Sequence, residues 1–178
     1  MVSGLIPHRY ARALYKFAAE SGKTKVVYGE MQNVVAAFRA DNRLEKILSN
    51  PFIDTEDKRN ILLAAAGSNP SDDYKRFVSL ILDHHREEFA YLMALAYLEI
   101  YRKENNISEV KITTAVKMPE SEIDKLRAVV EKSFKGITFE YHYAVDPSII
   151  GGFVIDVDST RMDASLSNEL EQLRQNLN

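Results

Sequence analysis

Apolar residues in the first 105 positions recur every three or four residues, which is the spacing of one face of an α-helix. Six such stripes follow one another, separated by helix-ending residues such as Gly22, Pro51 and Pro70. They cover residues 6–17, 27–38, 44–48, 61–65, 74–82 and 89–101. Short amphipathic helices joined by short loops predict a compact antiparallel six-helix bundle.

The period of the pattern changes after residue 105. Residues 110–116, 137–145 and 153–157 alternate between apolar and polar side chains, which predicts three strands. Pro119 opens a helix between the first two strands. Asp163 is expected to cap a last helix, which carries a leucine stripe at Leu166, Leu170, Leu173 and Leu177. The sequence therefore predicts an α+β protein with a six-helix bundle in residues 1–105. A small β-α-β-β-α domain follows in residues 106–178, as a three-stranded sheet with two helices on one face.

The composition of the chain excludes several classes of function. The 178 residues are 46% hydrophobic and carry a net charge of −3, which argues against binding to nucleic acid. With no cysteine, there is no disulfide framework, thiolate metal site or cysteine nucleophile. No apolar run approaches the roughly 20 residues that a membrane-spanning helix needs, and the start of the chain does not read as a signal peptide. We therefore expect no direct membrane insertion.

His84 and His85 form the densest group of potential metal ligands. Adjacent residues in a helix point about 100° apart, so these two histidines do not chelate one ion from one face. His84 and Glu88 are four residues apart, but no third ligand accompanies them. A solvated helix end is the better interpretation.

Asp156, Asp158 and Asp163 suggest a second cation site. The intervening residues lack the regular run of oxygen ligands around a glycine that a calcium loop requires. Polar edge positions and a helix cap explain these residues better, and we expect neither a metal nor a cofactor.

The Gly151-Gly152 pair precedes a strand, whereas phosphate-binding glycine loops follow a strand and open a helix. The pair is therefore expected to permit a bulge or a close backbone contact at the start of the strand. No serine lies in a nucleophile-elbow context, and none of the four histidines is paired locally with a nucleophile. The sequence predicts a protein without catalytic activity of its own.

The sequence supports candidate interaction surfaces better than it supports a metal, phosphate or catalytic site. The first helix has apolar residues on both sides, with Tyr15 opposite the main stripe, and Leu80 and Leu82 broaden the stripe of the fifth helix. Two interpretations remain open: these helices are central and bury both sides, or they form a groove for a partner's amphipathic helix. The C-terminal leucine stripe is likewise either the last core layer of the small domain or a coiled-coil-like contact.

Three segments together resemble one family. Residues 6–22 (IPHRYARALYKFAAESG) contain the aromatic–alanine pair Tyr10-Ala11, and residues 76–106 (RFVSLILDHHREEFAYLMALAYLEIYRKENN) contain Arg86. The C-terminal signature comprises Val145, Asp146, Ile149, Gly151, Gly152, Ile155, Asp163 and Ser165. This pattern is similar to the ATP synthase delta subunit family, which includes the mitochondrial oligomycin-sensitivity-conferring protein. The chain departs from the family pattern at His84-His85, at Ala164 in place of a glycine, and at Ser167 in place of a basic residue.

The resemblance implies a non-catalytic stator subunit of the F-type ATP synthase, present in one copy per complex and without a cofactor. In this family the helical domain binds the N-terminal helix of an alpha subunit on the catalytic headpiece, and the small domain binds the peripheral-stalk b subunits. The complex would lie at the cytoplasmic face of the bacterial plasma membrane, where the stator resists rotor torque during proton-driven ATP synthesis. The family's groove between the first and fifth helices corresponds here to Tyr10, Ala13, Leu14, Phe17, Phe77, Leu80 and Ile81.

The alternative from another class is a stand-alone adaptor that binds some other amphipathic helix. A hydrolase or metal enzyme is a third possibility, with less support from the residues.

Overall fold

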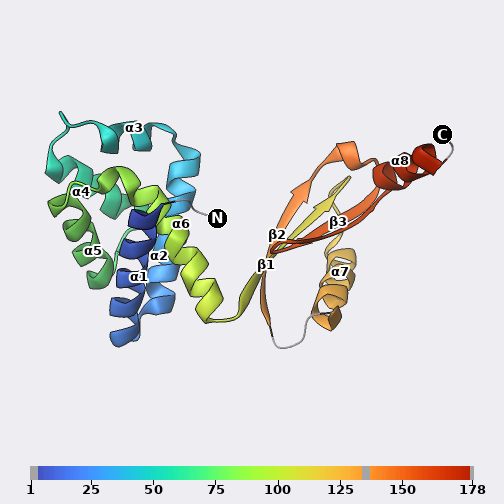
Figure 1. The fold of residues 1–178 in the computed structure, drawn as a ribbon, viewed down its shortest axis with the longest axis horizontal. Coiled ribbons are helices and arrows are strands. Elements are labelled where there is room, and N and C mark those ends of the chain that lie inside the picture. The colour runs from blue at the N-terminus through green and yellow to red at the C-terminus, as the bar shows by residue number, and fades with distance from the viewer. Residues whose placement is uncertain (1–3, 134–136, 177–178) are drawn as a thin grey trace. The chain divides into compact units, whose positions relative to one another are not determined.

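The computed structural model describes residues 4–133 and 137–176 and divides the chain into two compact units between Glu104 and Asn105 (Figure 1). Helices occupy the first unit and a sheet with helices the second, which confirms the α+β class and its order along the chain. Leu177, the last residue of the predicted leucine stripe, lies outside the described residues.

The first unit consists of helices joined by short loops. Gly22 ends the first of them in a left-handed conformation with φ of 69°. The amide of Gly22 donates to Ala19 O at 3.2 Å and that of Lys23 to Ala18 O at 2.8 Å, which is a Schellman ending and confirms Gly22 as the stop. The helices are α1 (Leu5–Glu20), α2 (Thr24–Ala40), α3 (Arg43–Ser49), α4 (Thr55–Ala66), α5 (Asp72–Asp83) and α6 (Ala90–Glu104), with a 3-10 turn η1 (Glu87–Phe89) before α6.

The core of this unit lies where α1 and α2 pack against α6. Ala11 and Ala18 are fully buried, and their small side chains permit close approach of α1. Tyr74 and Tyr97 are also buried, with their hydroxyls donating to Leu62 O at 2.8 Å and Thr24 O at 3.1 Å. Burial raises the pKa of both phenols, which therefore stay protonated and keep these hydrogen bonds.

The second unit contains a four-stranded sheet in the order β2-β1-β3-β4. β1 pairs in parallel with β2, while β3 pairs antiparallel with both β1 and β4. Ile112 at the centre lies opposite Tyr143 on one side and Ile155 on the other. The elements are β1 (Ile107–Thr114), α7 (Glu120–Ser133), β2 (Thr138–Val145), the 3-10 turn η2 (Pro147–Ile149), β3 (Gly152–Val157), β4 (Thr160–Ser165) and α8 (Leu166–Asn176).

Helix α7 covers one face of this sheet (Figure 1). Its Leu126 and Val130 pack on a buried cluster of strand residues, namely Val110, Ile112, Ile155 and Val157. In the described part of the chain, α8 adds no residue to this cluster, and its leucines are exposed. The predicted arrangement of two helices on one face of the sheet is therefore wrong: one helix covers it.

The fourth strand is a second correction, since the sequence predicts three. β4 has the sequence TRMDAS, and all its residues but the last are exposed. An edge strand exposed on both faces carries no alternation of apolar and polar residues, so its pattern resembles a loop.

The cap of the last helix also differs from the prediction. Ser165 Oγ accepts the amide of Asn168 at 3.2 Å, so Ser165 is the residue that caps α8. Asp163 lies in β4, where its carboxylate accepts the Ser165 hydroxyl at 2.6 Å and the Ser165 amide at 3.1 Å. Asp163 therefore orients the capping residue and is not the cap itself.

Candidate functional site

An open groove of about 360 Å³ runs between α1 and α5. Six of the seven residues predicted for a partner-binding groove line it. They are Tyr10, Ala13, Leu14 and Phe17 from α1, with Phe77 and Leu80 from α5. Both helices contribute residues at the three- and four-residue spacing of a single face, so the groove follows directly from the two apolar stripes.

The groove has a buried floor and an exposed rim. Leu14 and Phe77 are buried beneath it, whereas Phe17 is 36% and Leu80 is 40% exposed. Ile81, the seventh predicted residue, is not part of the lining and is 1% exposed in the core. It follows Leu80 by one position, which turns its side chain about 100° around the helix axis and into the unit.

A side-chain hydrogen bond joins α1 to α5 at each end of the groove. Tyr10 Oη lies 2.7 Å from His84 Nδ1 at one end, and the Ser21 hydroxyl donates to Asp73 Oδ2 at 2.5 Å at the other. The two bonds therefore link the α1 side of the groove to its α5 side at both ends.

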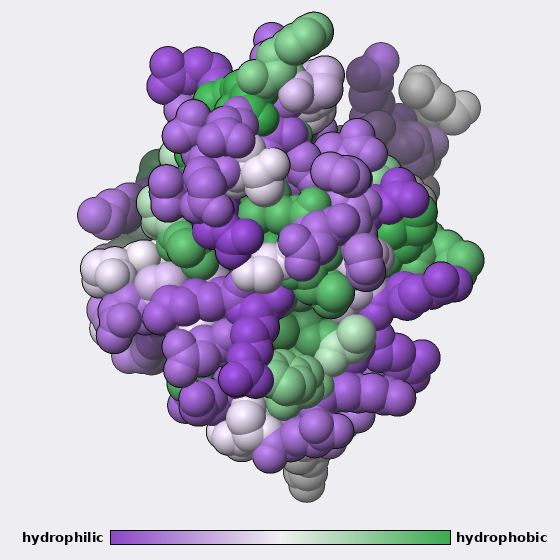
Figure 2. Space-filling view, turned by 90° about the vertical axis from the view of Figure 1, so that its left-hand side faces the viewer, coloured by the Kyte–Doolittle hydropathy of each residue, from purple (hydrophilic) through white to green (hydrophobic). Residues whose placement is uncertain are grey.

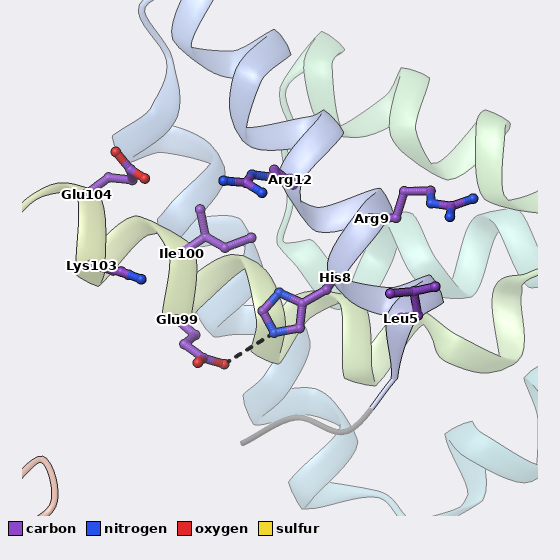
Figure 3. A pocket seen from close by; sticks show the side chains of 8 residues that line it. All are labelled: Leu5, His8, Arg9, Arg12, Glu99, Ile100, Lys103 and Glu104. Carbon is purple, nitrogen blue, oxygen red and sulfur yellow. Dashed lines mark ion pairs between the residues drawn. The ribbon is translucent and has the colours of Figure 1, made fainter.

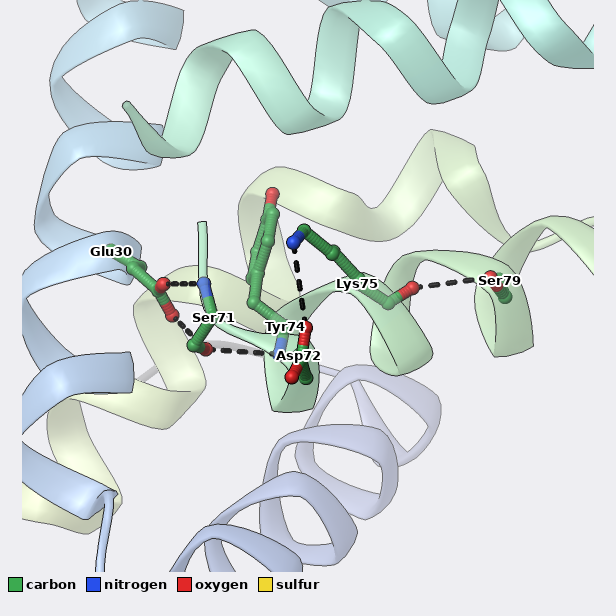
Figure 4. Close-up of polar contacts among 6 residues, drawn as sticks. All are labelled: Glu30, Ser71, Asp72, Tyr74, Lys75 and Ser79. Atoms are coloured by element: carbon green, nitrogen blue, oxygen red, sulfur yellow. Dashed lines mark hydrogen bonds and ion pairs between the residues drawn. The ribbon is translucent and has the colours of Figure 1, made fainter. Parts of the chain in front are cut away.

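The N-terminus of α5 is anchored to α2 by a buried carboxylate (Figure 4). Glu30 accepts both the amide and the hydroxyl of Ser71, and Ser71 Oγ in turn accepts the amide of Tyr74 at 3.2 Å. Ser71 is thus the N-cap of α5 and is itself held in place. This contact fixes the helix that forms one wall of the groove.

Two charged residues of the lining were not predicted. Asp73 and Arg76 precede Phe77 and Leu80 on the same face of α5, at positions i, i+3, i+4 and i+7. The helical spacing could have identified them, but a search for apolar residues alone leaves them out. The Arg76 guanidinium lies over the Phe17 ring, 5.8 Å from its centroid.

Figure 2 shows the side of the helical unit that carries α4 and α5. Hydrophobic side chains come to the surface in the middle of this face and are surrounded by hydrophilic ones. An apolar centre within a polar rim is the usual composition of a protein-binding surface.

A second hollow, of about 460 Å³, lies between α1 and α6 (Figure 3). Most of the side chains around it are charged, and His8 Nε2 lies 3.6 Å from Glu99 Oε2 across it. These side chains extend outward from the two helices. The α1–α5 groove, with its apolar floor, is therefore the better candidate site for an apolar partner.

Most residues of the family signature lie at one end of the sheet in the second unit, where they end or cap its elements. Val145 ends β2, and Asp146 caps η2 by accepting the Ser148 amide at 2.9 Å. Hydrogen bonding to the Ser148 side chain and amide lowers the pKa of the Asp146 carboxyl. Ile149 lies in η2, and Ile155 is buried in the core of the sheet. Asp163 and Ser165 lie in β4, where Ser165 caps α8 and Asp163 orients Ser165.

The glycine pair of the signature permits a close contact between β3 and the β4–α8 junction. Gly152 has φ of 75°, and a Cβ atom there would lie 2.2 Å from Ala164 O. A Cβ atom on Gly151 would lie 2.7 Å from the side chain of Leu166, whose amide donates to Gly151 O at 3.0 Å. The expected close backbone contact at the start of this strand is confirmed.

Helix α8 presents an apolar face. Leu166, Leu170 and Leu173 are between 47% and 58% exposed. A hollow of about 590 Å³ lies beside Leu170, with Ile150 and polar residues of α8 in its lining. Of the two interpretations of the leucine stripe, a last core layer is therefore excluded for these three residues.

The candidate ligand clusters do not assemble into a metal site. His84 is engaged by Tyr10, and Asp156 pairs with Arg161 at 3.6 Å. Asp158 accepts the amide of Glu109 at 3.1 Å. Among the residues that the structure describes, no three His, Asp or Glu side chains are placed to hold a metal ion. Over the same residues, no helix is both long and apolar enough to cross a membrane.

The fold and the groove define a two-unit α+β protein whose candidate site is a surface for binding another protein. Residues 6–177 match the family model described as ATP synthase delta (OSCP) subunit. The chain belongs to this family.

Curated relatives match this chain along nearly its whole length. The chain is 36% identical over 176 residues to the ATP synthase subunit delta of Phocaeicola vulgatus, covering 98% of this chain and 95% of the relative. It is 34% identical over 177 residues to that of Bacteroides fragilis, with the same coverage, and 30% identical over 166 residues to that of Lactobacillus delbrueckii subsp. bulgaricus, covering 93% and 92%. A chain in the cryo-EM structure of the Toxoplasma gondii mitochondrial ATP synthase hexamer has the same fold, with a TM-score of 0.73, 18% identity and 98% of both chains covered.

Proposed function

We propose that this chain is the stator subunit that joins the catalytic headpiece of an F-type ATP synthase to its peripheral stalk. The α1–α5 groove holds the N-terminal helix of an alpha subunit, and the second unit binds the b subunits through α8. Family membership supports the assignment, and the observation that carries it is the open apolar groove formed by residues at helix-face spacing.

The shape and chemistry of the groove suit a helix. Its α1 wall runs from Tyr10 to Phe17, which lie seven positions or about 10 Å apart along the helix, close to two helical turns. A helix with apolar residues at i, i+3, i+4 and i+7 presents a stripe of the same length. Exposed Phe17 and Leu80 on opposite walls would contact both sides of such a stripe.

The leucine face of α8 suits a helical partner of another kind. Leu166, Leu170 and Leu173 have the four- and three-residue spacing of a coiled-coil seam. A stalk of b subunit helices would extend this seam and bury it.

In this role the chain catalyses nothing and needs no cofactor. One copy per complex is attached at the cytoplasmic face of the bacterial plasma membrane through its partners, without inserting into the bilayer. Its task is to resist torque, so the affinity must come from apolar burial, at about 25 cal/mol per Å². Two separate contacts add avidity, because release from one partner leaves the other attached.

The test is an attachment assay with one charged substitution on each surface. Leu80→Glu places a carboxylate on the groove rim, and we expect it to abolish binding to isolated headpiece while binding to the stalk is retained. Leu170→Glu on α8 should abolish binding to the stalk while binding to the headpiece is retained. Both leucines are substantially exposed, so circular dichroism should show folded proteins.

Val26→Glu and Val116→Glu are the matched controls. They place the same charge on exposed valines of the helical and the sheet unit that line neither the α1–α5 groove nor the hollow beside α8. We expect both to bind headpiece and stalk normally. Normal headpiece binding by folded Leu80→Glu would overturn the placement of the groove.

A further inference from the structure

We propose that Arg76 recognises an acidic side chain on the helix bound in the groove, and thereby fixes the register and direction of that helix. This inference rests on the proposed function, since it names a feature of the partner that occupies the same site.

Arg76 lines the groove and lies against an aromatic ring of α1. Its guanidinium lies over the face of the Phe17 ring, 5.8 Å from the centroid. Among the residues that the structure describes, no carboxylate forms an ion pair with it. Stacking on an aromatic ring orders the long side chain in advance, which reduces the entropy lost when a partner binds.

The other charge of the lining is already engaged. Asp73 is only 5% exposed, and its carboxylate accepts the Ser21 hydroxyl. Arg76, in contrast, is exposed. The groove therefore offers an incoming helix one available charge, which is positive, at the border of an apolar floor.

Arginine at this border suits a carboxylate. Its planar fork donates two parallel hydrogen bonds to an Asp or Glu side chain, a geometry that lysine does not reproduce. Apolar burial of the neighbouring helix stripe lowers the local dielectric and strengthens the pair. Aligned apolar stripes alone tolerate sliding by one turn, whereas a single charge pair selects one register.

The position of Arg76 also predicts the direction in which the bound helix runs along the groove. It lies near the N-terminus of α5, at the end of the groove marked by the Ser21–Asp73 bond, while the Tyr10–His84 bond marks the far end. Acidic residues are favoured in the first turn of a helix, because they complement its dipole. A bound helix whose first turn carries the acidic residue therefore begins at the Ser21 end and runs parallel to α5.

The test is a set of double-mutant cycles measured by calorimetry on the full chain. The probe is a synthetic peptide of the first 20 or so residues of the cognate alpha subunit, with each acidic residue in turn replaced by its amide. We expect Arg76→Ala to weaken binding of the unmodified peptide about five- to tenfold. One of the amide peptides should bind the wild-type chain about as weakly as the unmodified peptide binds Arg76→Ala. That amide peptide should lose no further affinity when it is tested with the Arg76→Ala chain. Arg76→Glu should recover affinity for the peptide in which that same acidic residue is changed to Lys.

Lys75→Ala is the matched control, because Lys75 is a neighbouring cation on α5 that pairs with Asp72 and does not line the groove. It should bind every peptide as the wild-type chain does, while Arg76→Lys should bind with intermediate affinity. Equal weakening of all peptides by Arg76→Ala, with no coupled position and no recovery by charge reversal, would overturn this inference and leave the groove assignment intact. No binding of any peptide to the folded wild-type chain would overturn both.

Discussion

Gly152 shows how single residues position larger parts of this molecule. Its φ of 75° is a conformation that side-chain-bearing residues rarely adopt, and Ala164 O occupies the place of a Cβ atom. The preceding Ile150 also has a positive φ, of 68°, so the chain makes an unusual path into β3. The glycine pair of the family signature thus permits close packing of the backbone.

We predict that Gly152→Ala destabilises the sheet unit by about 3 kcal/mol, because it combines a strained φ with a backbone clash. Hydrogen-exchange protection of the β3 and β4 amides measures this loss directly. Gly29→Ala is the control, since Gly29 lies within α2 and a Cβ atom there meets nothing within 4 Å. That substitution should stabilise its helix by about 0.5–1 kcal/mol. Unchanged protection in Gly152→Ala would contradict the close contact with Ala164.

At the scale of elements, the sequence predicts those parts that carry a regular apolar period, which are helices α1 to α6 and strands β1 to β3. In β1 this period matches an alternation of buried and less buried residues, whereas β2 contains only half-buried and exposed ones. β4 has no regular apolar period along its sequence TRMDAS, so the pattern does not predict this strand. The family resemblance, and not periodicity, located the apolar wall residues of the groove, and it left out Arg76, which lies over the ring of Phe17 from another helix. The side to which Ile81 points is likewise decided by packing of whole helices.

The β4–α8 junction depends on pH in a predictable direction. Hydrogen bonds from the Ser165 hydroxyl and amide lower the pKa of Asp163 below its ordinary value of 3.8. A carboxyl with a lower pKa in the folded state stabilises that state above its unfolded pKa, and this contribution is lost as the pH falls through the folded pKa. We therefore expect Asp163→Asn to lower the thermal midpoint by a constant amount from pH 7 to 5, and the difference to shrink below about pH 4.

Ser165→Ala provides the background that isolates this effect. It removes the hydroxyl that donates to Asp163 and caps α8, so Asp163→Asn should have a much smaller and less pH-dependent effect in that chain. A difference that stays the same or grows between pH 5 and 3 would contradict the assignment of Asp163 as an ionised partner of Ser165.

At the scale of the molecule, each unit carries its own exposed apolar surface. The helical unit has the α1–α5 groove, and the sheet unit has the leucine face of α8. Neither surface identifies its partner by chemistry alone, and the periodicity of the sequence left both open to a purely structural interpretation. Family membership supports the proposed partners, and the exposure of Phe17, Leu80 and the α8 leucines provides surfaces for them.

Titration calorimetry of the full chain with the N-terminal peptide of the cognate alpha subunit tests this account most directly. We predict one-to-one binding with a negative heat-capacity change, because the apolar stripe of the peptide is buried in the groove. The folded Leu80→Glu chain should give no binding heat, whereas Val26→Glu should bind as the wild-type chain does. Absence of binding by folded wild-type chain, or undiminished binding by Leu80→Glu, would contradict the assignment of the α1–α5 groove as the docking site for the headpiece.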